Sequence, residues 1–145
     1  RGKAAVHAAG GVPDAARAAL SDLAGVNCPA GEAAGVLDAI AAKHGLTSMS
    51  SVIERLARRM EAILSAVPGI AGEARFRSGF GRRFTYYDGF VFETFGQHLT
   101  SRQPLASGGR YDGLIEGLSR SKASASGIGG IVRPDRILRA KGEMA

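Results

Sequence analysis

Aromatic and arginine side chains gather in one part of this sequence, where they can form a binding pocket. All six phenylalanines and all three tyrosines lie within residues 76–111. Tyrosine rings stack on other rings and hydrogen-bond through their hydroxyl, and arginine forms paired hydrogen bonds with a carboxylate or a phosphate. Together they predict a pocket for a small polar ligand that carries a ring and a carboxylate. The candidate binding residues are Arg82, Tyr86, Tyr87, Gly108, Gly109 and Tyr111.

The glycine pair in this set is predicted to lie at a turn between a strand and a helix. Glycine lets the backbone approach a ligand closely, and a helix N-terminus favours an anion. A structural role competes at each position considered alone, since most glycine pairs mark only a turn. On a strand, Tyr86 and Tyr87 would place one ring on each face, so at least one of them would be core. Arg110 and Asp112 would either pair with each other or cap the helix.

Composition narrows the class of protein. A chain of 145 residues that is 45% hydrophobic can bury one core. No apolar run has the length of a membrane span, and the alanine-rich start lacks the apolar centre of a signal peptide. The single cysteine, Cys28, excludes an internal disulfide and indicates a cytoplasmic protein. The scattered histidines His7, His44 and His98 do not have the spacing of metal ligands, so no metal site is predicted.

The net charge of +6 is unevenly distributed. Residues 1–70 hold seven basic and six acidic residues, whereas residues 71–145 hold twelve and seven. A basic half is compatible with nucleic acid, with an anionic ligand or with an ordinary solvated surface. The basic residues are dispersed and the aromatic residues have apolar neighbours, which favours a solvated surface with an anion pocket over contact with RNA.

Residues 1–70 are predicted to be helical. One helix should run from Pro13-Asp14 to about Leu23, and a second from Glu32 to His44 with Gly45 as its stop. The pattern Ser51-x-x-Glu54 predicts a capping box for a third helix, which Pro68-Gly69 ends. Its apolar stripe recurs every three or four residues and indicates packing, with no chemistry. The stripe consists of Ile53, Leu56, Met60, Ile63 and Val67.

Residues 71–145 change to a period of two, which is typical of half-buried strands. Strands are predicted over 74–80, 84–95, 105–107 and 128–132, with a helix over 111–119 and a closing helix from Pro134. Antiparallel strands joined by helices favour an α+β architecture, since nothing in the order of elements indicates a βαβ repeat.

Three segments together resemble the signatures of the histidyl-tRNA synthetase family. Arg82–Glu93 is similar to the family's Arg-Gly-Leu-Asp-Tyr-Tyr-Thr-Gly-x-Val-Phe-Glu, and Leu105–Leu114 to its Ala-Gly-Gly-Arg-Tyr-Asp-Gly-Leu. Gly129–Arg136 takes the place of the third signature of class II synthetases. The resemblance implies a class II aminoacyl-tRNA synthetase-like antiparallel sheet flanked by helices. Residues 71–145 would be the C-terminal part of that catalytic-domain fold, and residues 1–70 an insertion-like helical segment.

The resemblance also implies roles for the candidate residues in a histidine pocket. Tyr87 and Tyr111 would surround the imidazole, with Tyr86 beside them, and Arg82 would face the carboxylate and the α-phosphate. Gly108 and Gly109 would form the backbone floor. Arg136 would mark the nucleotide-like site, over the adenine.

Departures from the family pattern point to one of its branches. Thr85 stands at an acidic position, Asp88 at a threonine position and Arg83 at a glycine position. Arg133-Pro134 replaces a glycine-apolar pair, so ATP binding in the usual manner is not expected. The sequence ends nine residues after Arg136, before any anticodon-binding domain. These features favour the branch that serves as regulatory subunit of ATP phosphoribosyltransferase.

That branch implies a set of partners. The chain would join an ATP phosphoribosyltransferase catalytic subunit, support the first step of histidine biosynthesis and its feedback control, and bind histidine. It would be oligomeric, without membrane contact, cofactor or catalysis of its own. The alternative is a fragment of a histidyl-tRNA synthetase, which uses ATP, magnesium and tRNA, with Arg82 catalytic. A stand-alone ligand-binding module is the third hypothesis. Because the sequence opens at Arg1 without a methionine, we expect a piece of a longer protein.

Overall fold

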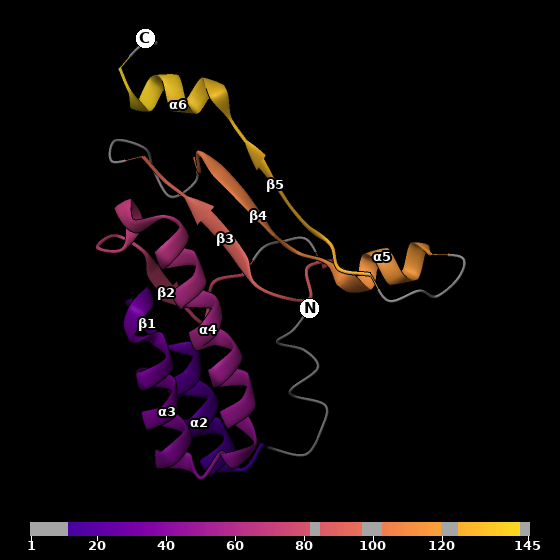
Figure 1. Cartoon of the computed structure of the whole chain (residues 1–145). Coiled ribbons are helices and arrows are strands. Elements are labelled where there is room, and N and C mark those ends of the chain that lie inside the picture. The colour runs from indigo at the N-terminus through magenta and orange to yellow at the C-terminus, as the bar shows by residue number, and fades with distance from the viewer. Residues whose placement is uncertain (1–11, 82–84, 97–102, 120–124, 143–145) are drawn as a thin grey trace. The chain divides into compact units, whose positions relative to one another are not determined.

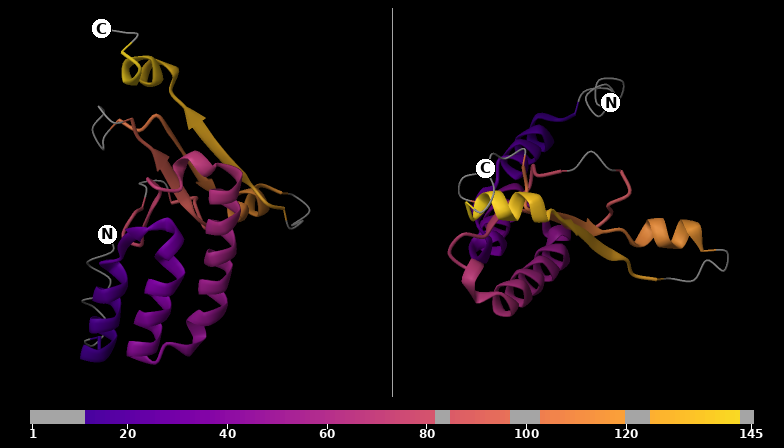
Figure 2. Two further views of the ribbon diagram at one scale, coloured as in Figure 1. Left: turned by 60° about the vertical axis from the view of Figure 1, so that its left-hand side comes forward. Right: turned by 90° about the horizontal axis from the view of Figure 1, so that it is seen from above.

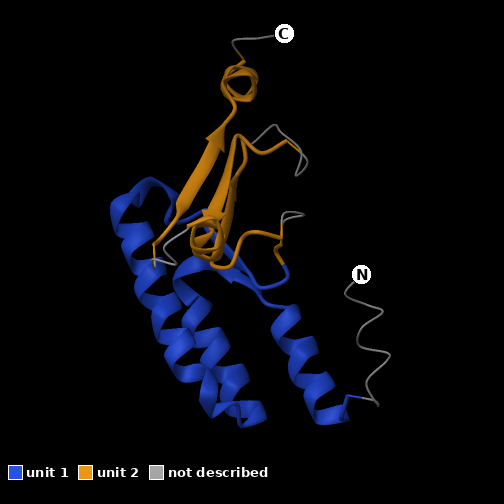
Figure 3. Ribbon diagram, turned by 90° about the vertical axis from the view of Figure 1, so that its right-hand side faces the viewer, with its two compact units in different colours: residues 1–79 blue, residues 80–145 orange. Residues whose placement is uncertain are grey.

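The computed structural model describes residues 12–81, 85–96, 103–119 and 125–142 (Figure 1). The chain divides into two compact units, residues 1–79 and residues 80–145 (Figure 3). The family-based division at residue 70 stays a prediction. No helix within the described ranges is both long and apolar enough to cross a bilayer.

Unit 1 is built on three helices that lie side by side (Figure 2). They are α2 (Asp14–Ala24), α3 (Ala33–His44) and α4 (Ser50–Ala66). Short 3-10 turns precede α3 and α4 and follow α4, namely η1 (Ala30–Glu32), η2 (Thr47–Met49) and η3 (Pro68–Ile70). Helix α3 ends at Gly45, whose φ of 66° is in the left-handed region that glycine adopts without strain, as the sequence predicted.

The core of unit 1 is closed by two short strands. Strand β1 (Asn27–Pro29) pairs antiparallel with β2 (Arg75–Arg77), and Cys28 lies opposite Phe76. Arg75 stabilises the pairing of β1 with β2, because its guanidinium donates hydrogen bonds to the side chain and the backbone carbonyl of Asn27, both at 3.0 Å. Phe76 packs against a buried cluster made of Val26, Cys28, Ala33, Leu37 and Ile53.

Two expectations for unit 1 were wrong. The strand predicted over 74–80 is only three residues long and pairs with β1, which the sequence did not predict. The predicted capping box does not form, because α4 begins at Ser50 and no side chain of its N-cap residue Met49 caps it. The apolar stripe is confirmed at Ile53, which is buried, whereas Val67 lies beyond the end of α4 and is exposed.

Unit 2 contains a three-stranded antiparallel sheet in the order β3-β4-β5. The strands are β3 (Val91–Thr94), β4 (Ala106–Arg110) and β5 (Ile128–Val132). Helix α5 (Asp112–Leu118) follows β4, and α6 (Pro134–Ala140) follows β5 (Figure 1). The mixed α+β class is therefore confirmed, and β5, α5 and α6 lie where the sequence predicted them.

Two other expectations for unit 2 were wrong. The strand predicted over 84–95 contains only Val91–Thr94, so Tyr86 and Tyr87 lie in irregular backbone before β3. The glycine pair does not form a turn. Gly108 and Gly109 lie inside β4, the central strand, where both are buried.

Candidate functional site

The three tyrosines of the chain form one cluster in unit 2. The rings of Tyr86 and Tyr87 have centroids 4.5 Å apart, and their hydroxyls lie 3.4 Å from each other. Tyr111 meets Tyr86 edge-on at 6.1 Å and lies 6.4 Å from Tyr87. These spacings are those of favourable aromatic pairs. The predicted tyrosines are therefore brought together.

The irregular backbone at Tyr86 and Tyr87 explains how adjacent residues share one side. Alternation would separate the two rings only on an extended strand. Residue 85 and Tyr86 belong to a turn, and β3 begins only at Val91. The prediction of one ring on each face was therefore wrong, and both rings are available to one site.

Glycines on β4 and β5 make room for these rings. Gly109 of β4 pairs with Gly129 of β5, so both would carry a side chain on the same face of the sheet. A Cβ on Gly109 would lie 2.7 Å from Cδ1 of Tyr87, and a Cβ on Gly129 would lie 2.7 Å from the hydroxyl of Tyr111. We call this the tyrosine face of the sheet.

Gly108 faces the opposite side. It pairs with Phe92 of β3 and Gly130 of β5, and a Cβ on Gly108 would lie 2.8 Å from Cε1 of Phe92. Phe92 stacks on Phe90 with centroids 6.2 Å apart. Of the two predicted floor glycines, only Gly109 therefore lies beneath the tyrosines.

Asp88 ties the tyrosine segment to α5. Its carboxylate accepts hydrogen bonds from the backbone N–H groups of Asp112, at 3.1 Å, and Gly113. These are N–H groups of the first helical turn, which have no partner inside the helix. Asp88 thus acts as a helix cap, 24 residues away in sequence. This role was not predicted, although an aspartate at a position where the family has threonine was a signal for it.

Asp112 extends this network to β5. Its carboxylate lies 2.7 Å from Nε of Arg110 and accepts the backbone N–H of Gly127 at 2.8 Å. The hydrogen bond from Arg110, followed by that from Gly127, lowers the pKa of Asp112 below its ordinary value. Arg110 also donates to the hydroxyl of Ser126 at 2.9 Å. The predicted pairing of Arg110 with Asp112 is confirmed.

Polar groups gather at the other end of the tyrosine face. Ser107 of β4 is 1% exposed and pairs with Glu93 on one side and Ile131 on the other. Arg133 follows β5 and donates to the Ser107 hydroxyl at 3.2 Å. The position of Arg133 in the third signature predicted only that it would hinder nucleotide binding.

Arg136, predicted to mark the nucleotide-like site, lies apart from Tyr111. Arg136 donates to the carbonyl of Pro104 at 3.0 Å, before the start of β4, whereas Tyr111 follows the end of that strand. Arg82 lies outside the described residues. Within the described part of the chain, no group of three potential metal-ligating side chains is assembled.

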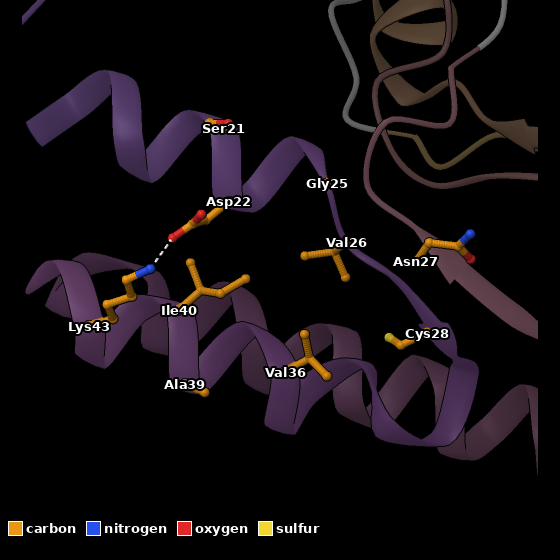
Figure 4. A pocket seen from close by; sticks show the side chains of 10 residues that line it. All are labelled: Ser21, Asp22, Gly25, Val26, Asn27, Cys28, Val36, Ala39, Ile40 and Lys43. Carbon is orange, nitrogen blue, oxygen red and sulfur yellow. Dashed lines mark hydrogen bonds and ion pairs between the residues drawn. The ribbon is translucent and has the colours of Figure 1, made fainter. Parts of the chain in front are cut away.

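Unit 1 contains a separate open groove of about 560 Å³ between α2, α3 and β1 (Figure 4). Apolar side chains line most of it, among them Val26, Val36 and Ile40. At one end Asp22 accepts hydrogen bonds from Lys43 at 2.7 Å and His44 at 2.8 Å. These bonds, the one from Lys43 first, lower the pKa of Asp22. No sequence pattern predicted this cluster, because its members come from different helices.

Comparison with known proteins places these features in a family. The family model described as histidyl-tRNA synthetase matches residues 2–133. An ATP phosphoribosyltransferase regulatory subunit from Mesorhizobium japonicum is 39% identical over 83% of this chain and 31% of its own length. One from Chelativorans sp. is 35% identical over 90% of this chain and 34% of its own length.

A histidine–tRNA ligase from Borreliella burgdorferi is 45% identical, but over only 39% of this chain and 12% of its own length. The chain spans about a third of the length of the regulatory subunits it matches. No solved structure matches it.

Proposed function

Because this chain belongs to the histidyl-tRNA synthetase family, we propose that it forms part of a regulatory subunit of ATP phosphoribosyltransferase. One observation carries the proposal. Similarity to proteins of that name extends over 77–90% of the chain in three relatives, across both units. Similarity to the histidine–tRNA ligase is confined to 58 residues.

The third signature supports a role without adenylation. Adenylation needs positive charge arranged around the reacting phosphate and a surface on which the adenine lies. Arg133 is engaged with Ser107, and Arg136 with the carbonyl of Pro104. Arg136, the predicted nucleotide-site residue, thus has a partner within the protein before the start of β4, away from Tyr111, which follows the end of that strand.

In the proposed role, the protein assembles with a catalytic subunit and supports the first step of histidine biosynthesis. Histidine is the ligand of the tyrosine cluster, where its ring contacts Tyr87 and Tyr111 while Tyr86 supports them. Binding there conveys the level of the end product to the catalytic subunit. The protein acts in the cytoplasm, needs no cofactor and carries out no reaction itself.

Reconstitution tests this function. The protein expressed from its complete gene should be required for phosphoribosyl transfer by a short ATP phosphoribosyltransferase catalytic subunit. It should show no histidine-dependent exchange of pyrophosphate into ATP, in an assay where a histidine–tRNA ligase serves as the positive control. A catalytic subunit that gains no activity from the protein would contradict the proposal.

A synthetase fragment is the second candidate, favoured by the 45% identity to the histidine–tRNA ligase over its matched segment. ATP, magnesium and tRNA would then be its ligands, and Arg82 would be catalytic. Pyrophosphate exchange that is strong in the wild type and disappears in Arg82→Ala would establish this second function and exclude the first.

A further inference from the structure

We propose that Arg133 binds the carboxylate of the amino acid whose ring contacts the tyrosine cluster. This inference rests on the proposed function, because it takes histidine as the ligand of unit 2. It assigns the carboxylate contact to a residue at which this chain departs from the family pattern.

The position of Arg133 follows from the register of the sheet. Ser107 and Gly109 are two residues apart on β4, so both face the same side. Gly109 lies under Tyr87, which identifies that side as the tyrosine face. Because the guanidinium of Arg133 reaches the hydroxyl of Ser107 at 3.2 Å, it too lies on the tyrosine face.

The separation of the two groups suits a free amino acid. A step of two residues along a strand covers about 7 Å. The positions of Ser107 and Gly109, beside which the guanidinium and the Tyr87 ring lie, are therefore about 7 Å apart. A ligand with a ring at one end and a carboxylate at the other, such as histidine, matches this spacing.

The guanidinium is fixed and still has free donors. Arginine carries five N–H donors in a rigid fork, and the hydrogen bond to Ser107 uses one of them. Ile131, which pairs with Ser107, is 53% exposed, so the sheet beside the guanidinium is open to solvent. A side chain that is already held in place loses less entropy when it binds a carboxylate.

Glu93 narrows the class of ligand further. It pairs with Ser107 from β3, so it lies on the same face as Arg133. A carboxylate beside the guanidinium disfavours an inorganic phosphate, which is strongly negative, relative to a ligand with a single carboxylate. The site is therefore assigned to a ligand with one carboxylate and a ring, such as histidine.

Two ligands, one with and one without the carboxylate, measure its contribution to binding separately from that of the ring. Calorimetry on this chain should compare histidine with histamine, which lacks the carboxylate. In Arg133→Gln, histidine affinity should fall roughly 10- to 100-fold, the loss of one charge-assisted contact, while histamine affinity stays unchanged. Arg139→Gln is the matched control, because Arg139 is an exposed arginine of α6 in the same unit. It should bind both ligands as the wild type does.

A second variant excludes a purely structural role for Arg133. Ser107→Ala removes the hydroxyl that holds the guanidinium but keeps the charge, so histidine affinity should fall less than in Arg133→Gln. The chain has no tryptophan and its three tyrosines all lie in the cluster, so near-ultraviolet circular dichroism shows whether the cluster is intact.

Equal losses for histidine and histamine in Arg133→Gln would overturn the inference, as would unchanged histidine affinity. A wild-type chain that binds no histidine would overturn it as well. The subunit function would stand or fall separately, on reconstitution with the catalytic subunit.

Discussion

The two units of this chain use their side chains in different ways. Among the described residues, all the buried hydrophobic side chains except Pro104 belong to unit 1, and these are Ala19, Val26, Cys28, Ala30, Ala33, Leu37 and Ile53. In unit 2, the buried positions of the sheet are Ser107 and the glycines Gly108 and Gly109, with aromatic rings lying against the glycines. Unit 1 thus has an aliphatic core, and unit 2 is a sheet that supports rings.

Unit 2 also leaves apolar surface uncovered. Ile128, Ile131 and Val132 of β5 are 65%, 53% and 60% exposed. Exposed apolar strands are favourable only when something covers them or binds to them. The difference assigns most of the hydrophobic stabilisation to unit 1, whereas the proposed ligand recognition belongs to unit 2. Mutations should therefore separate the two properties.

The largest expected effect on stability lies in unit 1. Ile53→Ala should lower the free energy of unfolding by about 2–5 kcal/mol, because it leaves a cavity in the buried cluster. Denaturation followed by far-ultraviolet circular dichroism measures this loss. Val52→Ala is the matched control, since Val52 is the neighbouring residue and is 49% exposed. The control should stay within about 0.5 kcal/mol. Similar losses in both variants would show that the buried cluster is not the source of stability.

The largest expected effect on recognition lies at the glycine beneath the tyrosines. Gly109→Ala places a methyl group 2.7 Å from the Phe90 carbonyl oxygen and from the Tyr87 ring, so one of them must move. Overpacking of this kind costs about 1–3 kcal/mol. The tyrosine signal in near-ultraviolet circular dichroism and histidine binding should both be lost.

Gly117→Ala provides the control for that change. Gly117 lies in α5 with nothing within 4 Å of an added Cβ. Alanine should raise stability there by up to about 1 kcal/mol, because glycine is a poorer helix former. If Gly109→Ala behaves like Gly117→Ala, the tyrosines do not pack on the sheet.

Local sequence signals predicted those helix ends that are fixed by a single nearby residue. Gly45 ends α3 through its own backbone conformation, and Pro134 opens α6 where its missing N–H has no cost. Strand β1 was not predictable in this way. It is three residues long, too short to show a period, and it is fixed by pairing with a strand 48 residues later.

In the candidate site, too, residue types were predictable from the sequence and long-range contacts were not. Residue types identified Tyr86, Tyr87, Gly109 and Tyr111 as a group, and the structure brings them together. Their arrangement depends on the contact between Asp88 and the start of α5, which no short window of sequence contains. Without knowledge of that contact, the residue pattern around Tyr86 and Tyr87 predicted that both lie on a strand.

Substitution of Asp88 should therefore have a moderate effect on both the stability of α5 and the arrangement of the tyrosines. Asp88→Ala removes the carboxylate that caps α5, and the loss of a helix cap costs about 0.5–2 kcal/mol. It also frees the tyrosine segment, so the near-ultraviolet signal of the tyrosines should weaken. Glu116→Gln, at an exposed position of the same helix, should change neither. An unchanged tyrosine signal in Asp88→Ala would mean that the cluster holds itself together.

The smallest expected effect is on stability in acid. Each unit contains a carboxyl group whose pKa is lowered, so the two units can be compared through these groups. The pKa values of Asp22 in unit 1 and Asp112 in unit 2 both lie below their ordinary value of 3.8. A carboxyl group whose pKa is lower in the folded state stabilises the fold above its unfolded pKa, and this stability is lost as the pH falls through the folded value. Both contributions should be complete at neutral pH and disappear below about pH 4.

Substitution should remove that acid dependence from one unit at a time. Asp22→Asn should flatten the fall in stability below pH 4 for the helices, and Asp112→Asn should do so for the tyrosine signal. Far-ultraviolet and near-ultraviolet circular dichroism follow the two units separately during acid titration.

The change should be small for Asp22, because water screens exposed ion pairs and Lys43 is largely exposed. Asp38→Asn, an exposed carboxylate of α3, is the control for Asp22. If Asp112→Asn altered the acid response of the helices as strongly as that of the tyrosines, the two units would unfold together and stability could not be assigned to unit 1 alone.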